Sequence, residues 1–102
     1  MSINKQFLKS RPICKVTFRL SKDIVQNAKV VNIVGEFNDW NNSHTFMKKL
    51  KNGSFVITVD LETGREYQFR YLINKHTWIN DDEADKLVSS GFTGSDNSVI
   101  IV

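Results

Sequence analysis

Apolar and polar residues alternate along much of this chain with the period of two that is typical of half-buried β-strands. The clearest example begins at Ile13, where every second residue through Leu20 is apolar. Similar alternation, or a run of β-branched and aromatic residues, recurs in six further segments. The predicted strands are residues 13–20, 29–37, 46–50, 54–61, 66–73, 78–79 and 98–102.

Turn-forming sequences separate these segments. Lys51-Asn52-Gly53 lies between two apolar runs, and Asn-Gly in that setting is a strong signal for a hairpin. About seven short strands with turns between them, and no convincing helix, predict an all-β fold, an antiparallel sandwich or barrel. In a sandwich one face of each sheet meets solvent, so residues that alternate outward are free to contact a ligand.

The length of 102 residues suits a single domain. Residues 1–12 show no sustained periodicity, and we expect them to form an N-terminal arm or a loose edge before a domain at residues 13–102. Hydrophobic residues make up 40% of the chain and charged residues 25%, as in ordinary globular proteins. The chain should therefore fold by itself.

The formal net charge of +3 raises nucleic acid or an acidic surface as a partner. The 14 basic residues are scattered among 11 acidic ones, so this signal is weak. The chain has no apolar run of membrane-spanning length and no signal-peptide pattern at its start. We expect a cytoplasmic monomer without a membrane partner.

Other reactive side chains do not form a recognisable site. The acidic stretch at residues 81–85 crowds its carboxylates into one loop, which predicts a solvated loop rather than a glycosidase pair or a calcium site. His44 and His76 stand alone in polar turns, and Cys14 falls on an apolar strand position where a buried, inert thiol is expected. No catalytic residue, metal or cofactor is predicted.

Two tryptophans are the most informative residues. Trp40 and Trp78 lie in or beside polar turns. An indole ring can cover the flat C–H face of a pyranose while nearby polar groups bond its hydroxyls. The alternative is that each tryptophan plugs one end of the sandwich.

The run from Val31 to Asn41 resembles the G-x-F-N-x-W signature of glycogen-binding modules in isoamylase, branching enzymes and the AMP-activated kinase β subunit. The later order of strands and turns is also similar, from about Cys14 to Val102. The resemblance implies an immunoglobulin-like, early-set β-sandwich that holds a helical α-1,4-glucan such as glycogen or starch. It implies no catalysis, because enzymes of this family use a separate barrel, a fold of about 250 residues.

The resemblance also assigns site residues. Trp40 matches the first stacking platform, and Trp78 matches the second with one extra residue in its turn. Arg70 stands where the kinase modules carry lysine, and it keeps the charge and can donate to sugar hydroxyls. Asn97 matches the polar residue before the last strand.

The loop that precedes Asn97 departs from the family pattern. Where the kinase modules carry a leucine that contacts the sugar and then a threonine, this chain has Thr93 and Ser95. Phe92 is next to them and is expected to take the place of the leucine. Ser95 and Phe92 thus complete the predicted carbohydrate-binding set.

Two other classes of function stay open. Some family members keep the fold without sugar binding, which would leave a structural or protein-interaction module, for example one that docks onto a glycogen-metabolising enzyme. A strand with Tyr67, Phe69 and Tyr71 beside Arg70 could instead stack on single-stranded nucleic acid. Alternation assigns these three rings to the core, so no nucleic-acid partner is expected.

Overall fold

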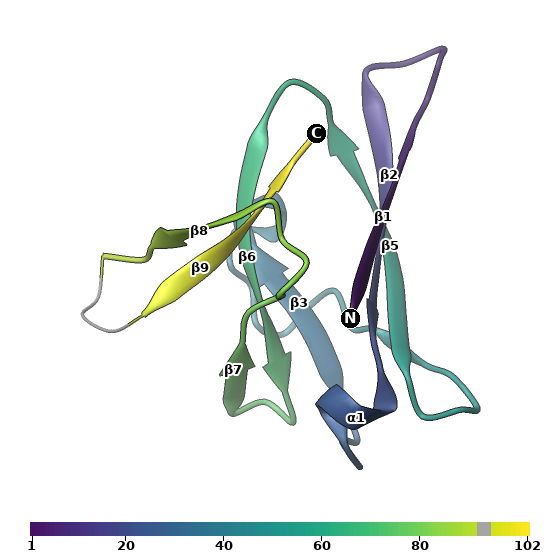
Figure 1. Ribbon diagram of the computed structural model, residues 1–102, viewed down its shortest axis with the longest axis vertical. Helices are drawn as coiled ribbons and strands as arrows, with labels where there is room; N and C mark the ends of the chain where they lie inside the picture. The colour runs from purple at the N-terminus through teal and green to yellow at the C-terminus, as the bar shows by residue number, and fades with distance from the viewer. Residues whose placement is uncertain (92–94) are drawn as a thin grey trace.

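The computed structural model describes residues 1–91 and 95–102. Two antiparallel sheets lie face to face as separate layers (Figure 1). The first sheet consists of β1 (Ser2–Phe7), β2 (Ile13–Leu20), β4 (Lys48–Lys49) and β5 (Phe55–Glu62). The second consists of β3 (Val31–Gly35), β6 (Glu66–Ile73), β7 (Thr77–Ile79), β8 (Lys86–Ser89) and β9 (Asp96–Ile101).

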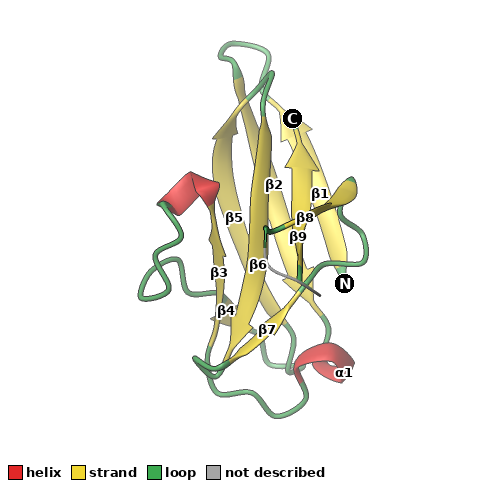
Figure 2. Ribbon diagram, turned by 90° about the vertical axis from the view of Figure 1, so that its left-hand side faces the viewer, coloured by secondary structure: helices red, strands yellow, loops and turns green. Residues whose placement is uncertain are grey.

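The strand order is β1-β2-β5-β4 in the first sheet and β3-β6-β9-β8 in the second, where β7 also pairs with β6. This arrangement confirms the predicted all-β sandwich. Helical structure among the described residues is limited to two short turns, α1 (Lys22–Val25) and a 3-10 turn at Glu36–Asn38. Figure 2 shows both turns beside the strands.

The core lies between the sheets and is rich in aromatic rings. The predicted inward residues of β2 and of β6 supply it, and Phe18 from one sheet packs edge-on against Phe69 from the other with 5.2 Å between ring centroids. Tyr71 continues this cluster, 5.7 Å from Phe69. Because the odd-numbered rings of β6 are buried, that strand offers no aromatic stacking platform for nucleic acid.

The N-terminal segment, expected as an arm or a loose edge, contains the edge strand β1, which pairs with β2 along its whole length. Its positions on the inward side of the sheet are Ile3, Lys5 and Phe7, of which Phe7 is exposed. Lys5 reaches across to the second sheet, where its Nζ lies 2.9 Å from an Asp85 carboxylate oxygen and 2.8 Å from the Ile101 carbonyl oxygen. Because Lys5 is charged and yet occupies an inward position, the sequence of β1 does not show a regular alternation of apolar and polar residues.

Candidate functional site

The turn that follows β3 begins at Gly35, the last residue of β3, which pairs with Phe69 of β6. A Cβ atom at Gly35 would lie 2.5 Å from the Gln68 carbonyl oxygen and 2.7 Å from the Phe69 Cβ atom, so only glycine permits this approach. Phe37 then turns back toward the core, with its ring centroid 6.5 Å from that of Phe18. The glycine and the phenylalanine of the sequence motif thus fix the course of the turn.

Asn38 holds the same turn by hydrogen bonds. Its side-chain oxygen accepts the Gly35 N–H at 3.0 Å, and its amide nitrogen donates to the Ile33 carbonyl oxygen and to the Thr45 hydroxyl, each at 3.0 Å. A short side chain with one acceptor and two donors is needed for this pattern. The asparagine of the motif therefore has a structural role.

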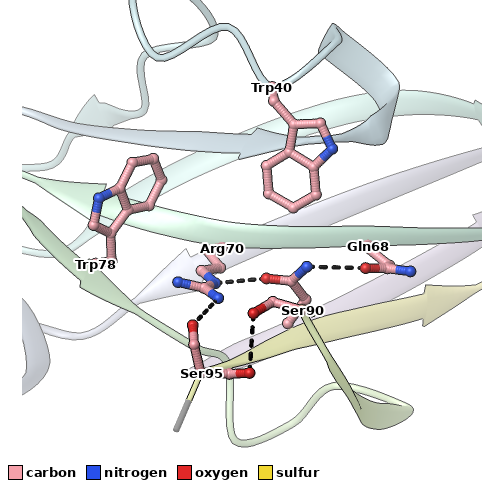
Figure 3. A pocket seen from close by; sticks show the side chains of 7 residues that line it. Trp40, Gln68, Arg70, Trp78, Ser90 and Ser95 are labelled. Carbon is pink, nitrogen blue, oxygen red and sulfur yellow. Dashed lines mark hydrogen bonds between the residues drawn. The ribbon is translucent and has the colours of Figure 1, made fainter. Parts of the chain in front are cut away.

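The backbone that carries Trp40 is constrained. Asp39 and Trp40 both have left-handed φ angles, 55° and 56°, a conformation that costs non-glycine residues about 1–2 kcal/mol each. The Trp40 N–H donates to the Gly35 carbonyl oxygen at 2.8 Å, which ties the tryptophan to the start of the turn. Its side chain stands over the outer face of the second sheet and is 40% exposed (Figure 3).

Trp78, on β7, also lies on the outer face of the second sheet. In the turn between β6 and β7, Asn74 and Lys75 adopt left-handed φ angles of 51° and 65°. The Asn74 side chain also accepts the Lys29 N–H at 2.8 Å, which fixes the turn to a neighbouring segment. Trp78 is opposite Leu72 in the β6–β7 register, an outward position, and is 44% exposed.

A hydrogen-bonded polar floor lies between the two tryptophans. Arg70 points outward from β6, and its Nε donates to the Asn97 side-chain oxygen at 2.6 Å while Nη2 donates to the Ser95 hydroxyl. The Asn97 amide in turn donates to the Gln68 side-chain oxygen at 2.9 Å (Figure 3). The guanidinium and the amides are therefore held in place before any ligand arrives.

These residues line a surface hollow of about 430 Å³, which we call the tryptophan hollow. It contains five of the six predicted binding residues, and the sixth, Phe92, lies outside the described residues. The lining among the described residues is Trp40, Gln68, Arg70, Trp78, Ser90, Ser95 and Asn97.

Sequence reasoning did not assign Gln68 or Ser90 to the site. Gln68 stands two residues before Arg70 on β6, so the alternation that turns Arg70 outward also indicates Gln68. Ser90 donates its hydroxyl to the Ser95 carbonyl oxygen at 3.0 Å. The periodic pattern of the sequence does not predict this contact.

The described lining of the hollow offers stacking and hydrogen-bonding groups. Its described lining combines two aromatic faces, amide and hydroxyl groups, and one formal charge, that of Arg70. None of the described lining residues is Asp, Glu, His or Cys, the usual acids, bases and metal ligands. Over the whole described chain, no group of three or more such residues lies close enough to hold a metal ion.

The family model for the glycogen recognition site of AMP-activated protein kinase matches residues 23–102. The chain belongs to this family. No curated protein matches the chain. Membership supports non-catalytic recognition of glycogen or a related glucan, and the matched range contains every residue of the tryptophan hollow.

The glycogen-recognition family match begins at α1, so β1 and β2 precede it. These two strands are nonetheless part of the sandwich, because β2 pairs with β5 over eight residue positions. Within residues 1–91 and 95–102 there is no helix with the length and apolar character needed to cross a bilayer.

One prediction about the acidic stretch of this glycogen-recognition domain is wrong. Asp81 was expected in a solvated loop, but it is only 2% exposed and accepts a 2.5 Å hydrogen bond from the Tyr71 hydroxyl. Its backbone N–H also donates to the Ser98 hydroxyl at 2.9 Å. Burial, together with the neighbouring Asp81 carboxylate, raises the pKa of the Tyr71 hydroxyl far above its usual value. Asp81 is therefore a buried anchor for the loop.

The remaining reactive side chains lie outside the tryptophan hollow. Cys14 is fully buried, and burial raises the pKa of its thiol, an effect that hydrogen bonding by the Gln6 backbone and the charge of Lys5 only partly offset. His44 and His76 are exposed, and each contacts the hydroxyl of the threonine that follows it.

Proposed function

We propose that this domain binds α-1,4-linked glucan of the glycogen or starch type without catalysis, in the tryptophan hollow. Trp40 and Trp78 each stack on a pyranose ring. The guanidinium of Arg70 and the side chains of Asn97 and Ser95 exchange hydrogen bonds with sugar hydroxyls. Phe92, which the resemblance assigns to the same loop, stays part of the predicted contact set.

One observation carries this proposal: two half-exposed indoles stand on the same outer face, on either side of a fixed polar floor. Indoles that merely plugged the ends of the sandwich would be buried, whereas Trp40 and Trp78 keep 40% and 44% of their surface exposed. Sugar rings present the apolar faces and hydroxyl edges that this arrangement complements.

The expected affinity is modest. If each indole buries about 100 Å² at about 25 cal/mol per Å², two stacks contribute roughly 5 kcal/mol, and association entropy offsets much of this. We expect a dissociation constant between tens of micromolar and millimolar, roughly −4 to −6 kcal/mol, for a short oligosaccharide. A polymer that offers many equivalent segments should be bound more tightly.

The direct test is native electrophoresis through gels with and without glycogen. Wild-type protein should be retarded, and Trp40→Ala, Trp78→Ala and Arg70→Ala should migrate freely once circular dichroism shows that each is folded. Phe7→Ala is a suitable control, because Phe7 is an exposed aromatic residue of β1, in the opposite sheet. This control should be retarded like the wild type.

Absence of retardation at high glycogen concentration would contradict glucan binding. The remaining interpretation would then be a structural or docking module, with the two tryptophans in contact with a glycogen-metabolising enzyme. We propose that the protein is cytoplasmic and that its glucan-binding form is a monomer. Sedimentation of the purified chain with and without oligosaccharide would check the oligomeric state.

A further inference from the structure

The tryptophan hollow contains a positive charge that the described protein does not neutralise. Four ion pairs occur among the described residues, and they use Lys5, Lys15, Arg65 and Lys86, but not Arg70. No carboxylate is among the described lining residues of the hollow. Arg70 is therefore a half-buried cation whose described partners are all neutral.

The hydrogen bonds of Arg70 occupy only one edge of its guanidinium group. Nε and Nη2 face Asn97 and Ser95 along the side edge. Nη1 makes no hydrogen bond within residues 1–91 and 95–102, so the end edge formed by Nη1 and the second Nη2 proton, which we call the open edge, has no partner among those residues. A guanidinium end edge matches two oxygens of a carboxylate or phosphate.

We propose that the hollow prefers α-glucan that carries phosphate monoesters over the same glucan without them, and that the open edge of Arg70 binds the phosphate. This inference rests on the proposed glucan function and adds a substrate class to it. Trp40 and Trp78 bind the sugar rings next to the substituted one, and the phosphate oxygens accept hydrogen bonds from Nη1 and Nη2.

The physical reason is the cost of covering an unpaired charge. A neutral glucan that fills the hollow removes water from the guanidinium and offers only hydroxyl oxygens in return. A phosphate monoester supplies an anion, and charge-assisted hydrogen bonds of this kind are shorter and about twice as strong as neutral ones. We expect phosphorylated glucan to bind about tenfold more tightly.

The test uses one batch of α-glucan with phosphate monoesters, half of which is treated with a phosphatase. Dissociation constants for both halves are measured by calorimetry at 50 and 300 mM NaCl. Wild-type protein should bind the phosphorylated half about tenfold more tightly at low salt, and this ratio should shrink at high salt because ions screen the pair. Binding of the dephosphorylated half should change little with salt.

Three variants test which residue causes the preference for phosphorylated glucan. Arg70→Gln keeps hydrogen-bond donors without the charge and should bring the ratio of the two constants close to one. Arg70→Lys keeps the charge without the planar edge and should give an intermediate ratio. Arg19→Gln removes an exposed cation from β2, on the other sheet, and should keep the full wild-type ratio.

The outcomes separate this inference from the proposed function. Equal binding of both halves would overturn the phosphate preference and leave glucan binding intact. A preference that survives in Arg70→Gln would overturn the assignment to Arg70. Binding to neither half would remove the proposed function and this inference together.

Discussion

The two outer faces of the sandwich obey the same alternation but differ in how their polar groups are used. On the first sheet the groups satisfy one another across β2 and β5: Lys15 Nζ lies 3.0 Å from an Asp60 oxygen, and the hydroxyls of Thr17 and Thr58 are 2.8 Å apart. On the second sheet, two exposed indoles surround the cation of Arg70, which has no carboxylate partner among the described residues.

The difference shows what alternation can and cannot predict. It predicts which residues leave the core, because successive side chains of a strand point to opposite faces. It does not predict whether outward groups find partners within the chain. A face whose groups are already paired gains little from a ligand, whereas a face with an open charge and open apolar rings gains hydrogen bonds and buried area.

The largest effect is expected from Gly35→Ala, which should disturb the outer face of the second sheet and leave that of the first sheet intact. The new Cβ would meet backbone atoms of β6 at 2.5–3.0 Å, so the turn that carries Trp40 must shift. We expect a loss of about 1–3 kcal/mol in the free energy of unfolding, measured with urea, and loss of retardation by glycogen.

Gly64→Ala is the matched control, because a Cβ there meets nothing within 4 Å and only the φ of 78° is unfavourable. It should cost about 1–2 kcal/mol in unfolding free energy and leave glycogen retardation unchanged. A Gly35→Ala protein that is as stable as the wild type and still retarded would contradict the structural role given to Gly35.

Asn97→Ala should weaken glucan binding at the outer face of the second sheet without unfolding the protein. It removes the acceptor that holds Arg70 Nε at 2.6 Å and the donor to Gln68. We expect about tenfold weaker glucan binding by calorimetry, equivalent to one hydrogen bond to a charged group. Thr17→Val removes a hydroxyl contact from the first face and should leave the affinity unchanged; equal losses in both variants would argue against a specific role for the floor.

Acid should weaken the contact between Lys5 and the Asp85 carboxylate, which joins the edges of the two sheets. Burial raises the pKa of Asp85, but hydrogen bonds from the Ile101 N–H and Lys5, with the Lys5 charge, outweigh it, so the pKa is lowered. A carboxylate with a lower pKa in the folded state stabilises the protein above its unfolded pKa of about 3.9, and this stabilisation disappears as the pH falls through the folded value.

Asp85→Asn tests this pH dependence. At pH 7 the variant should be about 1 kcal/mol less stable than the wild type in urea unfolding, and the difference should vanish well below pH 3.9. A difference that stays constant between pH 7 and pH 2 would show that the carboxylate charge is not responsible.

The smallest effect is expected from Lys15→Ala on the first face. The Lys15–Asp60 pair is well exposed, with 40% and 51% of the two side chains accessible, and such pairs contribute about 0–1 kcal/mol. Unfolding free energy should change by less than 1 kcal/mol, less still at high salt, and glucan affinity should not change. A marked loss of glucan affinity would mean that the two faces are coupled.

The sequence predicted seven of the nine strands found among the described residues, because these segments show apolar alternation, a β-branched run or a hairpin turn signal. The two missed strands lack such a signal. β1 places Lys5 on its inward side. β8 has only four residues, and Leu87 on it is largely exposed, so it buries too little apolar surface to give a pattern.

The candidate site was more predictable than the loop around it. The tryptophans and Arg70 were found from chemistry and resemblance, and the structure places them around one hollow with Ser95 and Asn97. The exposure of Asp81 was misjudged because local composition suggested a solvated loop, while its partner Tyr71 lies ten residues earlier, on β6. A buried hydrogen bond between a strand and a loop depends on tertiary packing, which periodicity alone does not encode.

The rigid turn that presents Trp40 has a consequence for the timing of binding. The Gly35 carbonyl holds the Trp40 backbone N–H and the Asn38 side chain holds the Gly35 N–H, so the turn does not have to reorganise and encounters can proceed at an ordinary rate of about 10⁶ M⁻¹s⁻¹. With a dissociation constant of about 10⁻⁴ M, each contact would last about 10 ms. On a branched polymer a released domain meets another segment at once, so its time on the particle is governed by the local density of chains.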